Sequence, residues 1–142
     1  AQVSGDAVLS ANYLLTKLKD TLSASFEGPC MHEALFDDRF LEGTGVTTLD
    51  FAKALIDQGF HPMTMYFPLV VHGALLIEPT ETESKETLDL FVKTMTEMAA
   101  KAKAGDVAFF TEAPKLTPRR RLDETLAARK PILVWKSDSE QD

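Results

Sequence analysis

The chain has 142 residues, a length that suits one domain with a modest single core. Its 44% hydrophobic and 26% charged residues are ordinary for a soluble globular protein, and no stretch approaches the roughly eighteen apolar residues of a membrane span. The net charge of -7 argues against a nucleic-acid surface, which needs a basic face, so neither nucleic acid nor a membrane is expected as a partner.

Helical and strand patterns alternate in the first part of the chain. The segment 7–22 carries one apolar stripe at helical spacing and predicts a helix that packs on the core. Short runs at 23–28 and 30–37 predict two strands, because turn-forming residues bound both of them. The glycine-bearing loop at 41–45 lacks the rest of any phosphate-binding motif and is interpreted as a connector.

A second helix is expected to begin near Thr47 or Thr48, either of which can cap it, and to end at Gly59, where glycine takes the left-handed conformation at little cost. Residues 60–72 are rich in aromatic and methionine side chains, but prolines exclude a regular helix or a central strand. We interpret this segment as an irregular crossing pinned against another surface. A buried strand at 73–78 is expected to follow it.

The third expected helix has the clearest pattern. Thr80 or Thr82 is predicted as its N-cap within a Thr80–Glu83 capping box, and lysines close the helix before Gly105. A long apolar stripe between these ends gives the helix one buried face.

Beyond Gly105 the pattern loses its regularity. A short helix is expected at 122–129 and an apolar piece at 131–135, and the polar residues 138–142 are predicted to form a tail. One domain is therefore expected over residues 1–137. The order of elements predicts an α+β fold, with a small antiparallel or mixed sheet of about three strands and helices packed on one face.

The residues do not contain a self-sufficient active site. His32, His61 and His72 are too far apart in the sequence for a local zinc motif, so no metal site is predicted. Cys30 near His32 could suggest a thiolate pair, but no third orienting group is evident and an unreactive cysteine fits better.

Two further features bear on the context of the chain. The run from Arg119 to Arg121 could bind a phosphate or carboxylate, although Asp123 and Glu124 beside it favour local pairing. A single cysteine has no internal partner, which favours a cytoplasmic protein with a reduced thiol. The chain starts at Ala1 without methionine, as expected for a piece of a longer protein.

Several blocks of sequence carry a family resemblance. Gly59-Phe60-His61-Pro62 with Thr64 resembles the stretch Gly-Phe-His-x-x-Thr of the glycine decarboxylase P-protein family, with Met63 standing where a second proline is common. Further matching blocks lie in the expected order at 11–14, 32–33, 71–89, 113–118, 121–124 and 127–131. The tail blocks resemble subunit 2 of the two-subunit form of the enzyme, although Arg119 replaces a small apolar residue.

The resemblance implies the C-terminal small domain of a fold-type-I enzyme that uses pyridoxal 5'-phosphate (PLP). In that family PLP serves as an electron sink while glycine loses carbon dioxide, and the aminomethyl group passes to the lipoyl group of H-protein. The lysine that holds PLP would lie upstream, so no catalytic residue and no bound cofactor are expected in this chain. The implied partners are the large PLP domain of the same chain, P-protein subunit 1, lipoylated H-protein and glycine.

Within the resemblance, His61, Thr64 and His72 are assigned to a wall of the active site or to a subunit interface. The alternative role of these three residues is to hold the irregular crossing in the fold. Two other identities stay open at this point. One is the small domain of another fold-type-I enzyme such as an aminotransferase, although neither Arg39 nor Arg129 lies in a recognisable carboxylate-binding motif. The other is an interaction domain without catalysis.

Overall fold

A computed structural model describes residues 1–135 and residue 137 of the chain. Within these residues it contains short strands and helices that share one hydrophobic core. In chain order the elements are α1 (Gln2–Leu18), β1 (Ser23–Ala24), β2 (Ala34–Asp37), the 3-10 helix η1 (Asp38–Leu41), α2 (Thr48–Asp57), β3 (Thr64–Met65), β4 (Leu75–Ile77), α3 (Lys85–Lys103), α4 (Val107–Thr111) and α5 (Glu124–Arg129). No helix in this part of the chain is both long and apolar enough to cross a membrane.

The strands form one antiparallel sheet in the order β1-β2-β4-β3. Ala34 pairs with Ile77 and Phe36 with Leu75, so residues of equal parity on β2 and β4 point to the same face. The predicted α+β class is confirmed, but the described residues hold four strands rather than about three. The additional strand is β3, which lies inside the segment that was predicted to be irregular.

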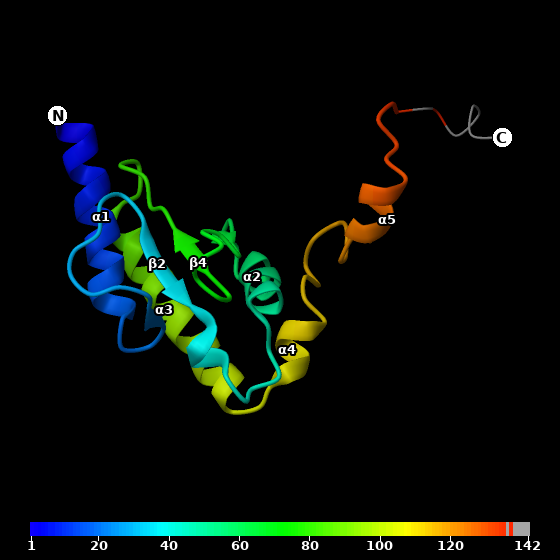
Figure 1. The fold of residues 1–142 in the computed structure, drawn as a ribbon, viewed down its shortest axis with the longest axis horizontal. Coiled ribbons are helices and arrows are strands. Elements are labelled where there is room, and N and C mark those ends of the chain that lie inside the picture. Colours follow the sequence, from blue (N-terminus) through cyan, green and yellow to red (C-terminus); the bar gives the residue numbers. More distant parts are fainter. Residues whose placement is uncertain (136, 138–142) are drawn as a thin grey trace.

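One face of the sheet carries the core and is covered by α1 and α3, which lie side by side behind it (Figure 1). Phe36 and Leu75 from the sheet are fully buried, as are Leu18 of α1 and Met95 of α3. Leu35 and Leu76 on the opposite face are only half-buried. The arrangement confirms the prediction of helices packed on one face of a small sheet.

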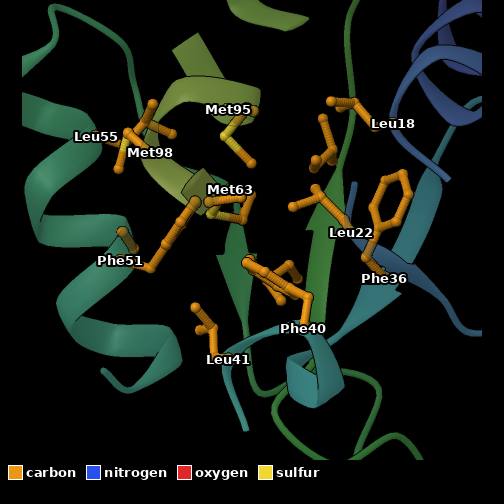
Figure 2. Close-up of a cluster of buried hydrophobic side chains, with 14 of the residues drawn as sticks. Leu18, Leu22, Phe36, Phe40, Leu41, Phe51, Leu55, Met63, Met95 and Met98 are labelled. Atoms are coloured by element: carbon orange, nitrogen blue, oxygen red, sulfur yellow. The ribbon is translucent and has the colours of Figure 1, made fainter. Parts of the chain in front are cut away.

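Phe51 of α2 packs between an aromatic ring of α4 and an aromatic ring of η1. Its ring stacks on Phe110 of α4 at 5.7 Å between centroids and meets Phe40 of η1 edge to face at 5.4 Å. Figure 2 shows Phe51 and Leu55 of α2 facing the methionines of α3 across this cluster. Aromatic contacts of this kind add to the gain from burial alone.

The capping residues in the sequence predicted the ends of the second helix, α2, correctly. Thr47 is the N-cap of α2, and the Thr47 side chain accepts from the Asp50 backbone N–H while Asp50 accepts from the Thr47 backbone N–H. After the helix, Gly59 has a φ of +86°, and the Phe60 N–H donates to the Leu55 carbonyl. Both predicted ends of this helix are confirmed.

Several boundaries were wrong, among them that of the strand expected over 23–28, which is only Ser23–Ala24. The first helix begins at Gln2 and ends at Leu18, earlier than the predicted 7–22. The strand expected over 30–37 is only Ala34–Asp37, because the Asn12 side chain binds both the N–H and the carbonyl of Cys30 and holds that residue in a loop. The N-cap of α3 is Ser84, not Thr80 or Thr82, whose hydroxyls bond to each other in the preceding turn.

The C-terminal region leaves the body of the domain. Helix α4 was not predicted, and after it the chain runs past α2 and continues into α5, which has no buried residue. Figure 1 shows α5 and residues 130–135 projecting away from the sheet and its helices. The apolar piece at 131–135 is exposed rather than packed, and the predicted tail at 138–142 lies outside the described residues.

Candidate functional site

A cavity of about 310 Å³ opens between α1, the end of β4 and the start of α3. Its apolar lining includes Leu14 of α1, Met63 from the segment after α2 and Leu88 of α3. Phe60 and Phe91 close one side, with their rings edge to face at 5.3 Å between centroids. Three separate parts of the chain therefore build this hollow, and its floor is apolar.

The polar groups that line the cavity are hydroxyls, an imidazole and carboxylates. Glu78 and Glu83 belong to the lining together with His61, and none of the lining residues is lysine or arginine. Carboxylates on the wall of an apolar cavity favour a neutral or cationic guest over an anion. The cavity is therefore poorly suited to a phosphate group.

A second candidate surface is the 66–72 loop, residues 66–72, between β3 and β4. The Tyr66 N–H donates to the Ala74 carbonyl at 2.9 Å, and the Tyr66 hydroxyl accepts from the Leu49 N–H at 3.2 Å. Tyr66 has a φ of +57°, which is uncommon for a residue other than glycine. The root of the loop is thus held, while Leu69 and Val70 are each 87% exposed at its tip.

The end of the 66–72 loop is fixed by close packing around Gly73. A Cβ at Gly73 would lie 2.0 Å from Cγ of Asp38, and the Thr48 hydroxyl donates to the Gly73 carbonyl at 2.9 Å. His72 Nδ1 lies 3.0 Å from Asp38 Oδ1. Only glycine fits this position, and the same Asp38 carboxylate that excludes a side chain there binds the neighbouring histidine.

The hydrogen bond and charge of Asp38 raise the pKa of His72 above the usual histidine value. Stability from this pair is fully present below the unfolded-state pKa, about 6.5, and is lost as the pH rises through the higher folded-state pKa. We expect Asp38→Asn to return the His72 pKa toward the ordinary value in an NMR titration of the imidazole protons. An unchanged titration would show that Asp38 does not control the charge of this histidine.

His32 lies against two carboxylates on the sheet. His32 Nε2 is 3.4 Å from Glu33 Oε1 and 3.8 Å from Glu78 Oε1; His32 and Glu78 are exposed and Glu33 is half-buried. The three ligand atoms lie within 4.8 Å of one another, a spacing that a metal ion could bridge but that exposed ion pairs also adopt. The spacing of the histidines in the sequence predicted no metal site. The sequence alone could not show that the residue before β2, Glu33, and the residue after β4, Glu78, lie close together.

The arginine run has one member that ties the C-terminal region to α2. Arg121 Nη1 lies 2.7 Å from Asp50 Oδ1, and the Arg121 guanidinium also donates to the carbonyls of Ala113 and Phe110 at 2.7 Å and 2.9 Å. The prediction of local pairing was wrong for Arg121, because its carboxylate partner is the distant Asp50 rather than Asp123 or Glu124. A guanidinium with these partners is not available to bind a phosphate.

The predicted wall residues do not converge on one point. His61 lines the cavity, whereas Thr64 lies exposed on β3 and pairs with Leu76 across the sheet. The side chain of His72 is 93% exposed and lies beside η1. The thiolate interpretation of Cys30 is not supported either, because burial raises the pKa of this thiol.

Comparison with known proteins assigns this fold and these surfaces to a family. The family described as "Glycine dehydrogenase, C-terminal domain" matches residues 3–113, more than half of the chain. The chain belongs to this family. The match covers every element from α1 to α4, so the cavity and the 66–72 loop are parts of the glycine dehydrogenase C-terminal domain.

Individual relatives agree with this assignment. A Caulobacter vibrioides protein named "Probable glycine dehydrogenase (decarboxylating) subunit 2" is 70% identical over 136 residues, covering 95% of this chain and 26% of the relative. Proteins of the same name from Caldanaerobacter subterraneus subsp. tengcongensis and Listeria innocua are 53% and 48% identical, over 91% and 93% of this chain and 26% and 27% of their own lengths. The chain thus spans about a quarter of these relatives.

Sequence reasoning missed several groups that shape this glycine dehydrogenase domain. The Asp50–Arg121 pair joins residues 71 positions apart, and the Thr48–Gly73 and Tyr66–Leu49 hydrogen bonds join α2 to the 66–72 loop. Pairing over such separations has no periodic signal. Gly73, next to the matched His72, was the one local sequence feature consistent with a close approach between the backbone and another segment.

Proposed function

We propose that the chain is the C-terminal part of subunit 2 of a glycine dehydrogenase (decarboxylating), the P-protein of glycine cleavage. The complete enzyme would remove carbon dioxide from glycine with PLP and pass the aminomethyl group to the lipoyl group of H-protein. The observation that carries the proposal is 70% identity to a subunit 2 protein over 95% of this chain. Subunit 1 is the partner that the name of the relative implies, and the unpaired Cys30 suits the cytoplasm.

The described residues do not form a PLP site of their own. The cavity lining has no lysine to bind the cofactor aldehyde and no cation to bind its phosphate, and it carries Glu78 and Glu83 instead. Among the described lysines that form an ion pair, Lys53 has the least exposed side chain. Its Nζ lies 3.7 Å from a carboxylate oxygen of Glu124, and Lys53 is not among the cavity-lining residues. The proposal therefore assigns cofactor binding to the rest of subunit 2 and predicts that this chain alone has no decarboxylase activity.

The role assigned to this domain is to wall the active site of the complete enzyme. The crossing from His61 to His72 begins at the cavity and ends in the exposed 66–72 loop, whose root is held by backbone and side-chain hydrogen bonds. An exposed apolar tip on a fixed root can cover a neighbouring site and exclude water from it without itself rearranging. His61 and His72 would then supply polar groups at the two ends of the wall, with Thr64 between them.

Substitution of the histidines in the full-length enzyme tests this role. We expect His61→Asn and His72→Asn to lower the rate of exchange between the glycine carboxyl group and bicarbonate at least about tenfold, because misplacement by 1 Å near reacting groups has effects of that size or larger. The melting temperature should change little, since both histidines are exposed. The exchange assay in the presence of H-protein, with separate KM and kcat values, measures the effect.

His32→Asn is the matched control, because His32 is also exposed and lies outside the cavity lining and the loop. It should leave the exchange rate and KM near the wild-type values. Normal decarboxylation and normal aminomethyl transfer in both test variants would contradict the proposed role of this segment as a wall of the active site. A wild-type enzyme, assembled with subunit 1 and PLP, that fails to exchange the glycine carboxyl group would overturn the proposed function itself.

A further inference from the structure

His32, Glu33 and Glu78 form a cluster of potential metal ligands where β2 begins and β4 ends. Ala34 of β2 pairs with Ile77 of β4. The same antiparallel register, continued by one position, places Glu33 opposite Glu78. Residues in that arrangement have Cβ atoms about 4.5–5.5 Å apart, and two carboxylates there repel each other. The fold therefore brings two like charges together from segments that are distant in the sequence.

Among the described residues, no lysine or arginine forms an ion pair with either of these two carboxylates. The basic group that contacts them is the His32 imidazole, whose Nε2 lies 3.4 Å from Glu33 Oε1 and 3.8 Å from Glu78 Oε1. One imidazole carries a single positive charge at most, so the cluster keeps an excess of negative charge. A surface ion pair needs only one carboxylate, and the second one favours a doubly charged cation.

The distances between the donor atoms fit the coordination sphere of a small divalent ion. One donor atom from each of the three residues lies within 4.8 Å of the other two. With metal–ligand bonds of about 2.0–2.2 Å, the edge of a tetrahedral zinc site is about 3.3–3.6 Å long. The His32–Glu33 distance of 3.4 Å has this length, and the His32–Glu78 distance of 3.8 Å is only slightly longer. A small rotation of the exposed Glu78 side chain closes the difference.

The loop that carries His32 is fixed to α1 on one side and to the sheet on the other. The Asn12 side-chain amide donates to the Cys30 carbonyl at 2.7 Å, and its oxygen accepts from the Cys30 N–H at 3.0 Å. After His32, the chain passes through Glu33 directly into β2. The backbone on both sides of the imidazole is therefore held, which lowers the ordering cost of binding an ion.

We propose that His32, Glu33 and Glu78 bind one divalent transition-metal ion, with Zn²⁺ as the preferred ion. One imidazole and two carboxylates are ligands that suit Zn²⁺, and three protein ligands leave a fourth position for water. Ca²⁺ and Mg²⁺ fit less well, because both favour a larger number of oxygen ligands. The ion joins the start of β2 to the end of β4 and neutralises the two carboxylates. The site stabilises the domain, so it stands independently of the proposed function.

Calorimetric titration of the full-length protein with Zn²⁺ alone, after removal of metal with a chelator, measures the affinity. We expect His32→Ala, Glu33→Gln and Glu78→Gln each to weaken binding at least about tenfold, because loss of a group that only orients a metal ligand already costs about 10–100-fold. None of the three side chains is in the core, so the variants should fold. Glu81→Gln is the matched control. It removes one exposed carboxylate outside the cluster and should leave the affinity unchanged.

Thermal unfolding of the same proteins gives a second measurement, in which the effect of Glu78→Gln changes sign. Without metal, Glu78→Gln should melt no lower than wild type, because it removes the repulsion between the two carboxylates. With Zn²⁺ at about a hundred times its Kd, wild type should gain at least about 2 °C and the variant less. A side chain that only packs in the fold would lower the melting temperature equally with and without Zn²⁺.

Co²⁺ in place of Zn²⁺ reports the geometry, since four-coordinate Co²⁺ absorbs visible light far more strongly than six-coordinate Co²⁺. We expect a strong visible band in wild type and in Glu81→Gln, and its loss in His32→Ala. Equal Zn²⁺ affinity of wild type, His32→Ala and Glu78→Gln would overturn the proposal. So would an equal loss of affinity in Glu81→Gln, which would show that Zn²⁺ collects on acidic surface in general. The glycine carboxyl exchange assay is unaffected by either outcome.

Discussion

Phe51→Ala is expected to destabilise the domain by about 3–5 kcal/mol, a large share of the roughly 5–15 kcal/mol that holds a typical domain folded. Phe51 is fully buried and touches an aromatic ring on each side, so its removal leaves a cavity and breaks both ring contacts. Because Phe51 joins η1, α2 and α4, the neighbouring rings cannot close the gap without moving three elements. Urea unfolding of the 142-residue chain, followed by circular dichroism, measures the loss.

Phe26→Ala is the matched control for this prediction. It removes the same side chain from a position that is 66% exposed and outside the core, so the change in unfolding free energy should stay within about 0.5 kcal/mol. If the two variants lose equal free energy of unfolding, the buried ring of Phe51 stabilises the domain no more than an exposed ring does.

The sequence was informative where structure depends on neighbours in the chain. The capping box at Thr47 and Asp50 and the left-handed Gly59 were predictable, because both signals lie within one turn of the helix they bound. The buried strand at β4 was predictable for the same reason, as a short apolar run between turn residues. A capping signal can still mislead, since Thr80–Glu83 has the pattern and Ser84 has the role.

The rest depended on contacts between distant segments. The strand β3 consists of two residues, Thr64 and Met65, which are ordered by pairing with β4 and have no periodic pattern of their own. Helix α4 is five residues long, too short for its apolar stripe to show. The cavity requires α1, β4 and α3 together, so the matched block could single out His61 but could not place it in a cavity that Glu83 also lines.

The candidate site shows the same division. Resemblance selected His61, Thr64 and His72 as a group, and the structure places one of them at the cavity and the other two elsewhere on the crossing. The partner of His72 is Asp38, which is 34 positions away and belongs to η1. A shared role for the three residues therefore requires a surface that spans the whole crossing, as a wall does, rather than a single binding point.

Loss of the Arg121 side chain is expected to cost about 2–4 kcal/mol, because it breaks a charged pair and leaves the Asp50 carboxylate largely buried without its guanidinium partner. Arg121→Ala also frees the carbonyls of Ala113 and Phe110 at the end of α4. Arg121→Lys keeps the charge but not the planar fork and should recover only part of the stability. Arg119→Ala is the control, since Arg119 is exposed, and it should have an effect below about 0.5 kcal/mol.

The destabilisation expected from Arg121→Ala should depend on pH, because it acts through the ionised carboxylate of Asp50. Burial would raise the pKa of Asp50, but hydrogen bonds from Thr47 and the Arg121 guanidinium outweigh it and hold the pKa below its usual value. The stability from the ionised carboxylate is therefore present above the unfolded-state pKa, about 3.9, and is lost as the pH falls through the lower folded-state pKa. The difference in unfolding free energy between wild type and Arg121→Ala should be full at pH 7 and should shrink below about pH 4. A difference that stays constant down to pH 2 would mean that Arg121 acts through its two carbonyl partners and not through Asp50.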